Sequence, residues 1–311
     1  MGKTNDKLGE VNNRMISVVM ATYNGEKYIK EQLQSILKQT RIPDEIVISD
    51  DASTDCTIEE INKMISSTDY RNIKLYQNNK RLGYARNFAK AIGLARGNYI
   101  FLSDQDDIWN KKKIEIMEGI LADNPNIQLL SSSFNLIGET GNQLINGKAN
   151  GVLREIKKNQ FFRHPKYPGM AMAFRRELWD TITDNRKQKM VAHDWLLGYT
   201  ASDKNGFYQL NKPLCNYRQH SSNESGTIQS SSGRNKIQQR IRTINGLIDN
   251  MSSIADEECK ELSWIKGYLE FQNKRKEILL DKKRGLLLAY LMRNKKYISW
   301  KSILGDFYTL I

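Results

Sequence analysis

Short apolar runs alternate with stretches of helical spacing over the first hundred residues of the chain. The runs are rich in β-branched and aromatic residues and have the length of buried strands. They predict strands at 15–21, 45–49, 73–76 and 98–102. Between them, apolar residues recur every three or four positions and predict helices at 26–39, 57–66 and 84–95. Such alternation predicts βαβ units and a mainly parallel sheet.

The pattern is less regular in the middle of the chain. It predicts strands at 127–135, 169–174 and 214–218, and helices at 176–182 and from His193 onward. The Gly-rich stretch 138–151 predicts a surface loop or a hairpin.

Polar composition predicts two flexible segments in the chain, and helical periodicity predicts a C-terminal helical region. The polar residues 1–14 predict a flexible tail, and the Ser- and Gly-rich residues 223–233 predict a flexible linker. In the region 234–311, amphipathic spacing predicts three helices, around 237–251, from Leu262, and at 285–293. A catalytic domain would then occupy residues 15–222.

Composition narrows the class of protein. A hydrophobic content of 39% suffices for a folded core, and no apolar run has the length of a signal peptide or a membrane span. The three cysteines, Cys56, Cys215 and Cys259, form neither a metal-type spacing nor a disulfide framework. We therefore expect a protein of the reducing cytoplasm.

The net charge of +13 is concentrated near the C-terminus. Between Lys274 and Lys301, ten Lys and Arg residues stand against two acids, interleaved with Leu, Tyr and Trp. This mixture favours adsorption to an anionic membrane, which predicts a peripheral protein at the inner face of the plasma membrane. The alternatives are nucleic-acid binding, helices that form a homodimer, and a solvated basic helix packed on its own domain.

Two clusters of acids follow predicted strands. Asp50 and Asp51 follow the second strand, and Asp104, Asp106 and Asp107 follow the fourth. Carboxyl ends of parallel strands share one side of a sheet, where ligands bind. Three adjacent carboxylates repel one another unless a cation lies between them, which indicates a divalent metal and a phosphate-bearing ligand. The alternative is a polar turn in which Asp107 caps a helix starting near Ile108.

Three segments of the chain, taken together, resemble the family 2 glycosyltransferases, which are inverting enzymes. The resembling segments are Ser17–Asn24, Ile46–Asp55 and Phe101–Asp107. The resemblance implies an α/β architecture, the GT-A Rossmann-like nucleotide-diphospho-sugar transferase fold with a mostly parallel central sheet, extended here by C-terminal helices. The form of Ser103–Trp109, with Tyr217–His220 later, resembles the rhamnosyltransferase-type branch.

The resemblance also assigns residues to the sugar donor. It places the nucleotide base near Asp51 or Asp50 and the ribose near Asp104, while Arg86 and Arg218 could face the diphosphate. The donor-nucleotide residues expected in this way are Thr22, Tyr23, Asn24, Asp50, Asp51, Arg86, Asp104 and Arg218. Asp106, Asp104 and His220 are expected to hold Mn²⁺ or Mg²⁺. Helix capping is the alternative for Asp50 and Asp51, and a structural histidine is the alternative for His220.

The catalytic base is expected at Asp194. The sequence His193-Asp194-Trp195 matches the place of the family's acidic base, and enclosure by Trp195 would raise the pKa of that carboxyl. His193, Trp195, Gly169 and Met170 are the expected acceptor-binding residues. Capping of its helix is the alternative for Asp194, and core packing is the alternative for Trp195.

These observations favour an inverting glycosyltransferase over two other classes. The donor would be dTDP-rhamnose or a UDP-hexose, and the acceptor a glycan or lipid-linked glycan of cell-surface polysaccharide synthesis. A nucleic-acid- or anionic-surface-binding protein would not need the acids, which repel a polyanion, so no nucleic-acid partner is expected. A dinucleotide-dependent dehydrogenase is disfavoured because Asn24-Gly25, rather than G-x-G-x-x-G, follows the first strand.

Overall fold

The computed structural model describes residues 14–163, 167–220, 233–255 and 262–309. The predicted N-terminal tail, apart from its last residue, lies outside these residues. The predicted linker lies outside them as well, except for Gly233, its last residue.

The described residues form two compact units. The first comprises the described residues up to Lys158, those from 167 to Thr183, and those from Ala192 to 220. The second comprises residues 159–163, Asp184–Val191 and the described residues from 233 onward. Two short segments from within the stretch 15–222 thus group with the C-terminal helices.

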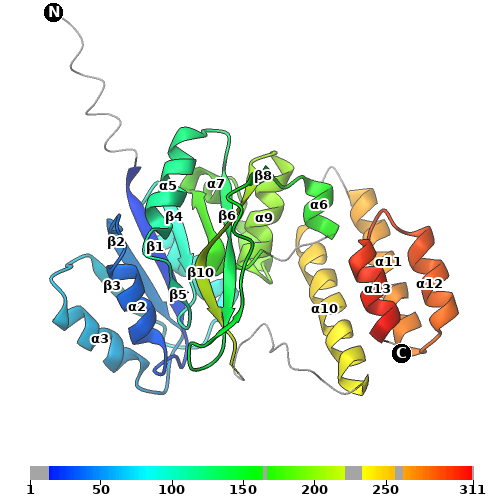
Figure 1. Ribbon diagram of the computed structural model, residues 1–311, viewed down its shortest axis with the longest axis horizontal. Coiled ribbons are helices and arrows are strands. Elements are labelled where there is room, and N and C mark those ends of the chain that lie inside the picture. Colours follow the sequence, from blue (N-terminus) through cyan, green and yellow to red (C-terminus); the bar gives the residue numbers. More distant parts are fainter. Residues whose placement is uncertain (1–13, 164–166, 221–232, 256–261, 310–311) are drawn as a thin grey trace, which may run out of the picture. The chain divides into compact units, whose positions relative to one another are not determined.

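The first unit contains every strand of the described structure (Figure 1). Its strands are β1 (Ile16–Thr22), β2 (Glu45–Asp50), β3 (Ile73–Gln77), β4 (Tyr99–Ser103), β5 (Ile108–Trp109), β6 (Leu129–Ile137), β7 (Gln143–Ile145), β8 (Leu153–Glu155), β9 (Met172–Arg175) and β10 (Phe207–Arg218). Its helices are α2 (Ile29–Leu37), α3 (Thr57–Ser67), α4 (Tyr84–Leu94), α5 (Lys113–Asp123), the 3₁₀ helix η2 (Gly169–Ala171), α7 (Arg176–Asp180) and α9 (His193–Asp203).

The strands form one sheet in the order β3-β2-β1-β4-β9-β6-β10-β5, with β7 beside β6 and β8 beside β10. β9 is antiparallel to both β4 and β6, so the six strands β1 to β4, β6 and β10 share one direction. The mostly parallel α/β sheet predicted from the sequence is therefore confirmed.

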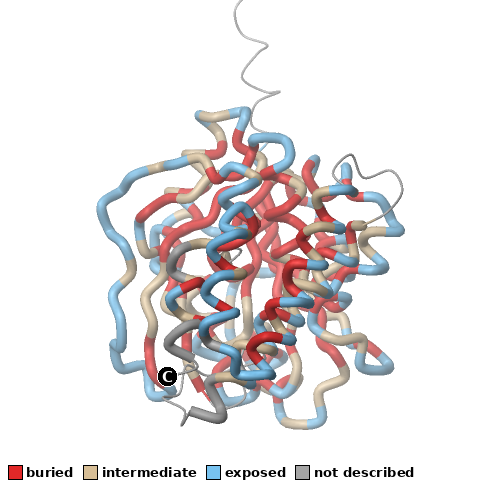
Figure 2. Tube along the Cα trace, turned by 90° about the vertical axis from the view of Figure 1, so that its right-hand side faces the viewer, coloured by how far each residue is buried: buried red, intermediate tan, exposed pale blue. Residues whose placement is uncertain are grey.

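Helices cover both faces of the sheet. Val18 and Met20 of β1 pack in one cluster with apolar residues of α2, α3 and α5, while α4 packs against β1 and β2. The strands at the centre of the unit are buried on both faces, as the red stretches of Figure 2 show. Such strands are continuous apolar runs in sequence, which explains why the pattern predicted them correctly.

The structure corrects the predicted element after the second acidic cluster. Ile108 and Trp109 do not start a helix, because they pair with Asn216 and Cys215 of β10 and stay extended as β5. The following helix, α5, begins only at Lys113. The alternative in which Asp107 caps a helix near Ile108 is therefore wrong.

Two predicted strands have different bounds in the structure. The strand expected from Gly169 begins at Met172, because η2 occupies the three residues before it. The short strand expected at 214–218 is the end of the 12-residue β10, whose first part carries the polar residues Gln209, Asn211 and Lys212. The Gly-rich stretch 138–151 contains β7, which forms an antiparallel hairpin with β6.

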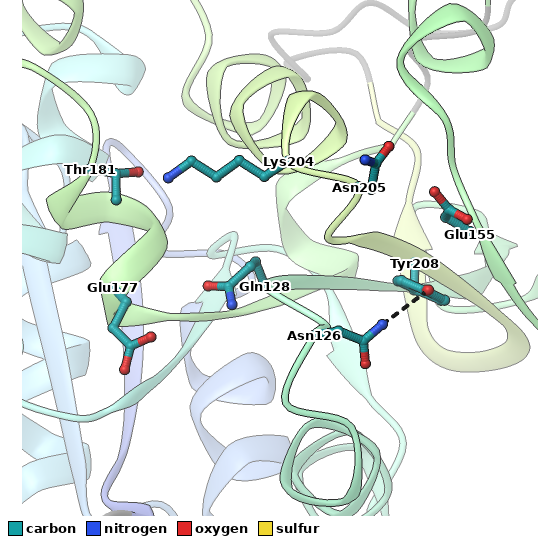
Figure 3. A pocket seen from close by; sticks show the side chains of 8 residues that line it. All are labelled: Asn126, Gln128, Glu155, Glu177, Thr181, Lys204, Asn205 and Tyr208. Atoms are coloured by element: carbon teal, nitrogen blue, oxygen red, sulfur yellow. Dashed lines mark hydrogen bonds between the residues drawn. The ribbon is translucent and has the colours of Figure 1, made fainter.

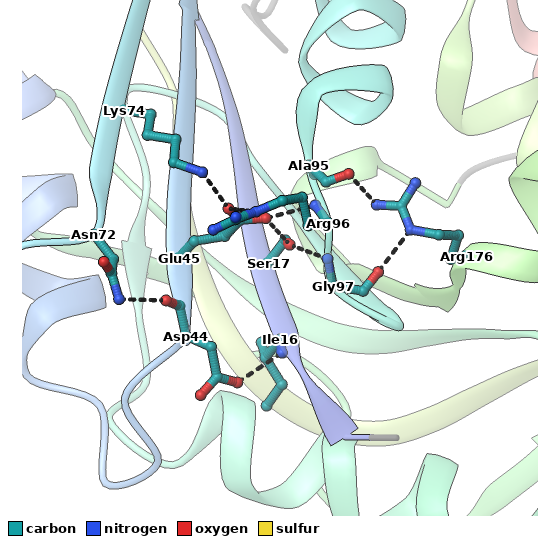
Figure 4. A network of polar contacts seen from close by, with 10 residues as sticks. All are labelled: Ile16, Ser17, Asp44, Glu45, Asn72, Lys74, Ala95, Arg96, Gly97 and Arg176. Carbon is teal, nitrogen blue, oxygen red and sulfur yellow. Dashed lines mark hydrogen bonds and ion pairs between the residues drawn. The ribbon is translucent and has the colours of Figure 1, made fainter. Parts of the chain in front are cut away.

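A buried glutamate ties the strands together at their amino ends (Figure 4). Glu45 is fully buried and accepts hydrogen bonds from the hydroxyl of Ser17, the backbone N–H of Arg96 and the ammonium of Lys74. Burial opposes its charge, but these donors outweigh burial and hold the pKa of Glu45 below its ordinary value. Nearby, the guanidinium of Arg176 donates to the carbonyl oxygens of Ala95 and Gly97.

The second unit is helical. Its elements are most of α6 (Lys158–Arg163), then α8 (Asp184–Lys189), α10 (Gly233–Ile254), α11 (Leu262–Leu280), α12 (Arg284–Arg293) and α13 (Trp300–Thr309). The three predicted C-terminal helices correspond to α10, α11 and α12, and α13 was not predicted. α11 packs against α10 and α12, and α13 against α10 and α12.

The interior of the helical unit combines aromatic rings with one buried ion cluster. The rings of Phe162 and Trp264 stack at 4.7 Å between centroids. The fully buried Asp306 accepts hydrogen bonds from the guanidinium groups of Arg240 and Arg275. None of the described helices is both long enough and apolar enough to cross a bilayer.

Candidate active site

The predicted donor residues gather where β1 and β2 end. Thr22 pairs in register with Asp50, so the residues that follow both strands emerge together. The buried carboxylate of Asp50 accepts hydrogen bonds from the hydroxyl of Thr22 (2.8 Å) and from the backbone N–H of Ser53 (2.9 Å). The side-chain oxygen of Asn24, which has a positive φ of 46°, accepts the N–H of Thr54. Asp50 and Asn24 thus shape this turn.

Asp51 holds the loop that leads into α4. Its buried carboxylate accepts hydrogen bonds from the side-chain amide of Asn78 (3.0 Å) and from the backbone N–H groups of Leu82 (2.7 Å) and Gly83 (2.8 Å). These bonds use about three of its four acceptor positions. The N-cap of α3 is Cys56, so neither Asp50 nor Asp51 caps the next helix.

Gln105, which the sequence analysis did not single out, joins the two strand-end clusters. Its side-chain oxygen accepts the backbone N–H of Tyr23, and its amide donates to the carbonyl oxygen of Tyr23, both at 2.9 Å. A Cβ on Gly25 would lie 2.2 Å from the Gln105 oxygen, so glycine makes room for this contact. The guanidinium of Arg81 lies 4.0 Å from the centroid of the Tyr23 ring.

The two outer acids of the second cluster differ in burial. Asp104, directly after β4, is partly exposed, whereas Asp107 is fully buried. Asp107 Oδ1 accepts the backbone N–H of Arg218 at 3.0 Å, while its Oδ2 has no hydrogen-bond partner among the described residues. Burial, reinforced by the charges of Asp106 and Asp104, raises the pKa of Asp107 well above its ordinary value.

Arg218 ties the end of β10 to the second acidic cluster. Its guanidinium is almost fully buried and donates to the carbonyl oxygens of Asp106 and Glu139 and to the carboxylate of Glu31. It also lies 4.9 Å from the centroid of the Tyr28 ring. These contacts show that Arg218 holds neighbouring loops together, and its expected contact with the diphosphate stays a prediction.

Asp106 and His220 meet at the ends of β4 and β10. Nε2 of His220 lies 2.8 Å from Oδ2 of Asp106, and the imidazole packs against the Tyr28 ring at 4.8 Å between centroids. These contacts bring together two residues that lie more than a hundred positions apart in the sequence.

The predicted metal set of Asp104, Asp106 and His220 is only partly assembled. Among residues 14–163, 167–220, 233–255 and 262–309, no three His, Cys, Asp or Glu side chains are gathered into a metal-binding group. A carboxylate oxygen and an imidazole nitrogen nevertheless fit Mg²⁺ or Mn²⁺, which commonly take one or two protein ligands and complete their shell with substrate phosphates and water.

Asp194 lies in the first turn of α9 and is partly exposed. Because the surrounding protein removes water from the carboxylate, its pKa rises to about 6. The backbone N–H groups of Trp195, Asp194 and Gly169 offset part of this rise. The N-cap is Ala192 rather than Asp194, although the carboxylate of Asp194 accepts the first-turn N–H of Trp195 at 2.7 Å.

His193 precedes Asp194 in the chain and is buried. Its ring stacks on Phe88 at 3.9 Å between centroids, and neither ring nitrogen has a hydrogen-bond partner among the described residues. Burial lowers the pKa of His193 to about 3, so the imidazole is neutral. A Cβ on Gly169 would lie 2.6 Å from His193 Nε2. The structure therefore brings Gly169, His193 and Asp194 close together.

The other expected acceptor residues have structural contacts. Trp195 is buried and stacks on Tyr199, one helical turn later, at 5.7 Å between centroids, so the structure favours core packing for its ring. The carbonyl oxygen of Met170 accepts a hydrogen bond from the fully buried ammonium of Lys113, which also lies 3.7 Å from the centroid of the Trp109 ring. Burial lowers the pKa of Lys113 to about 8. Lys113 thus anchors η2, whose Gly169 N–H bonds to Asp194.

Two further features of the first unit are Arg86 and a pocket. Arg86 is exposed on the first turn of α4, after the loop that Asp51 holds. An open pocket of about 650 Å³ lies at the amino ends of β6 and β10 (Figure 3). It is lined by Asn126, Gln128, Glu155, Glu177, Thr181, Lys204, Asn205 and Tyr208. No residue of the predicted site lines this pocket.

The fold is shared with solved structures of low sequence identity. S. aureus TarS 1-349 in complex with UDP-GlcNAc aligns with a TM-score of 0.59 at 19% identity, over 89% of this chain and 79% of that one. The mannosyltransferase PcManGT from Pyrobaculum calidifontis in complex with GDP-Man and Mn²⁺ aligns with a TM-score of 0.55 at 19% identity, over 95% and 85% of the two chains. The predicted GT-A fold is thereby confirmed.

Sequence comparison identifies the family. The chain is 35% identical over 221 residues to the dTDP-rhamnosyl transferase RfbG of Shigella flexneri. The matching segment covers 67% of this chain and 73% of that protein. The family described as "Glycosyl transferase family 2" matches residues 17–183, which include both strand-end clusters. The chain therefore belongs to glycosyltransferase family 2 and is a glycosyltransferase.

Proposed function

We propose that this enzyme transfers a sugar from a nucleoside diphosphate donor to an acceptor hydroxyl with inversion, and that Asp194 is the general base. The observation that carries the proposal is the Asp194 carboxyl, which is partly exposed and has a pKa raised to about 6. A base with a pKa near the working pH is ionised at neutral pH and still takes up a proton readily. Exposure gives an acceptor hydroxyl access to it.

One base is sufficient for inverting transfer. Asp194 would remove the proton from the acceptor hydroxyl while that oxygen forms a bond to the anomeric carbon. The bond from that carbon to the diphosphate oxygen breaks on the opposite face, and its electron pair leaves with the nucleoside diphosphate. His193, neutral because it is buried, cannot form an ion pair with Asp194.

On the donor side, we assign the nucleotide to the turn formed by Thr22, Tyr23, Asn24, Asp50 and Asp51, with the ribose near Asp104. The support for this assignment is the register of Thr22 with Asp50, which brings the ends of β1 and β2 together. Asp50 and Asp51 already accept hydrogen bonds from the protein. Arg86, exposed at the start of α4, is the arginine that we assign to the diphosphate.

Asp106 and His220 are the residues that would hold Mn²⁺ or Mg²⁺. Such an ion, when bound, would neutralise negative charge on the departing diphosphate. The 2.8 Å contact between Asp106 and His220 and their donor chemistry support this assignment. Titration of the protein with Mn²⁺, followed by electron paramagnetic resonance, tests it without relying on turnover, because Asp106→Ala should weaken binding.

The donor that we favour is dTDP-rhamnose, with a UDP-hexose as the alternative. The support is the likeness to a dTDP-rhamnosyl transferase over 67% of this chain. The acceptor that we favour is a glycan or a lipid-linked glycan of cell-surface polysaccharide synthesis.

A donor screen tests the proposal. Purified protein would be incubated with dTDP-rhamnose, UDP-glucose, UDP-GlcNAc and GDP-mannose, with Mn²⁺ or Mg²⁺, and release of the nucleoside diphosphate measured. We expect release from one donor, and proton NMR of a transferred product should show an inverted anomeric configuration. A retained configuration would contradict a single-base mechanism.

A further inference from the structure

Helix α12 of the C-terminal unit presents an apolar face to solvent. One side of this helix packs against α11 and α13, and Leu287 and Leu291 on that side are fully buried. On the other side, Leu286, Leu288 and Met292 remain 52%, 39% and 41% exposed.

Helical geometry spreads these exposed side chains over the half of α12 opposite Leu287 and Leu291, with Leu286 and Leu288 near its two edges. With 3.6 residues per turn, positions 285, 286, 288, 289, 292 and 293 share the face opposite Leu287 and Leu291. Gly285 and Ala289, between the larger residues, are exposed too. A helix at the surface of a globular protein normally turns polar residues outward, so a continuous apolar face indicates an interaction surface.

Basic residues border both ends of this face. Lys282 and Lys283 precede α12, Arg293 ends it, and Lys295 and Lys296 follow, and all five are exposed. From residue 281 to residue 296 the sequence contains six Lys or Arg residues and one acid, Asp281, which lies 3.2 Å from Lys283. The apolar face thus has a positively charged border.

We propose that the α12 surface, defined as Leu286, Leu288 and Met292 with the bordering basic residues, binds the surface of an anionic lipid bilayer. The apolar side chains would enter the level of the lipid headgroups, while the long basic side chains reach lipid phosphates. A second copy of this surface fits less well, because two positively charged borders would oppose each other across a twofold axis. A nucleic acid would leave the three apolar side chains without a matching surface.

This inference goes beyond the proposed transfer reaction and does not depend on the identity of the donor. Its consequence is that the enzyme would act next to a membrane, where a lipid-linked acceptor is held. Because α12 lies in the helical unit and carries no residue assigned to the active site, membrane binding and sugar transfer can be tested separately.

Flotation of the full-length protein with vesicles tests the proposal. The vesicles would contain either phosphatidylcholine alone or equal parts of phosphatidylcholine and phosphatidylglycerol. We expect flotation with the anionic vesicles only, and the triple variant Leu286→Ser, Leu288→Ser, Met292→Ser should bind them at least about tenfold more weakly. The matched control is Leu144→Ser, Ile145→Ser in β7, whose side chains are 48% and 59% exposed and should be dispensable.

The charge contribution has its own matched pair of variants. Lys282→Ser, Lys283→Ser should weaken anionic vesicle binding by about fivefold for each charge, whereas Lys111→Ser, Lys112→Ser, exposed in the first unit, should have little effect. Unaltered melting temperatures and unaltered dTDP binding would show that the variants are folded.

Three results would overturn the proposal. The first is equal flotation of wild type and the apolar triple variant. The second is equal loss in the β7 control. The third is a wild-type dimer in light scattering that the triple variant converts to a monomer while vesicle binding is unchanged, which would assign the face to a second copy.

Discussion

Two carboxylates packed into the first unit, at opposite ends of its parallel strands, have opposite environments. Glu45, at the amino end of β2, accepts hydrogen bonds from Ser17, Arg96 and Lys74, and its pKa is lowered. Asp194 accepts hydrogen bonds from the backbone N–H groups of Trp195, Asp194 and Gly169, and its pKa is raised to about 6.

The difference shows that one end of the sheet carries a carboxylate that stabilises the fold, and the other end carries one that is suited to accepting a proton. Burial opposes a negative charge in both places, and the kind of donor decides which effect dominates. The donors to Glu45 include the ammonium of Lys74, whereas those described for Asp194 are neutral backbone N–H groups. At the amino end the donors suffice, so the charge holds three chain segments together. At Asp194 they do not, and the resulting unfavourable charge is what a base needs, at a cost in stability.

The largest effect is expected from removing the base. Asp194→Asn should lower the transfer rate by about a thousandfold, within the range typical of a lost general base, while dTDP binding persists. Initial rates and calorimetric titration with dTDP would measure the two quantities. The control is Asp184→Asn, which changes an aspartate in the first turn of α8 that is 91% exposed and should leave the rate unaltered. A variant at Asp194 that turned over at the wild-type rate would remove the assignment.

The next largest effect is expected from the amino end of the sheet. Glu45→Gln should reduce the free energy of unfolding by about 2–4 kcal/mol at pH 7, because it removes the charge that its donors face. Glu45 has a lowered pKa, so its stabilisation is present above pH 4.5 and is lost as the pH falls through the lowered folded value. Urea unfolding at several pH values would show wild type and variant converging in acid.

The surface glutamate Glu59 provides the control for that comparison. Glu59 is exposed in the first turn of α3, and Glu59→Gln should change the free energy of unfolding by less than about 0.5 kcal/mol. Equal losses in the free energy of unfolding for Glu45→Gln and Glu59→Gln would mean that the buried hydrogen bonds of Glu45 do not stabilise the protein.

A smaller and opposite change in stability is expected at the base itself. Asp194→Asn should raise the free energy of unfolding by about 1–2 kcal/mol at pH 8, because the variant no longer holds a poorly solvated charge. The pKa of Asp194 is raised, so its favourable contribution is complete below pH 3.8 and is lost as the pH rises through about 6. The gain should therefore vanish near pH 4. A loss of stability at pH 8 would show that the ionised carboxylate is well satisfied.

The smallest effect is expected at the bridge between the two strand-end clusters. Gln105→Ala removes two hydrogen bonds to the backbone of Tyr23 and should destabilise the protein by about 1 kcal/mol. It should also weaken dTDP binding, since Tyr23 would no longer be fixed. An unaltered dissociation constant would show that the bridge contributes to the fold alone.

The sequence predicted the elements whose burial is continuous. β1, β2 and β4 are buried along almost their whole length, so each is an unbroken apolar run, and the acids that follow them had to emerge on one side of the sheet. The first part of β10 was not predicted from the sequence, because Gln209 and Asn211 interrupt its apolar pattern.

Residues whose role depends on distant partners could not be predicted. Lys113 ends the run Asn110-Lys111-Lys112-Lys113, which has the composition of a solvated surface, yet the fold buries its ammonium against Met170 and Trp109. The contact between Arg218 and Glu31 spans 187 positions. Neither the burial of Lys113 nor the contact of Arg218 with Glu31 produces a local sequence pattern. The pair His193-Asp194 could be singled out from the sequence because its residues are adjacent in the chain.

The pH dependence of transfer is the most direct test of Asp194 as a desolvated base. The account predicts that kcat/KM of the wild type falls about tenfold per pH unit below pH 6 and levels off above it, and that the residual activity of Asp194→Asn lacks this limb. A rate independent of pH between 5 and 8, or the same limb in Asp194→Asn, would contradict it.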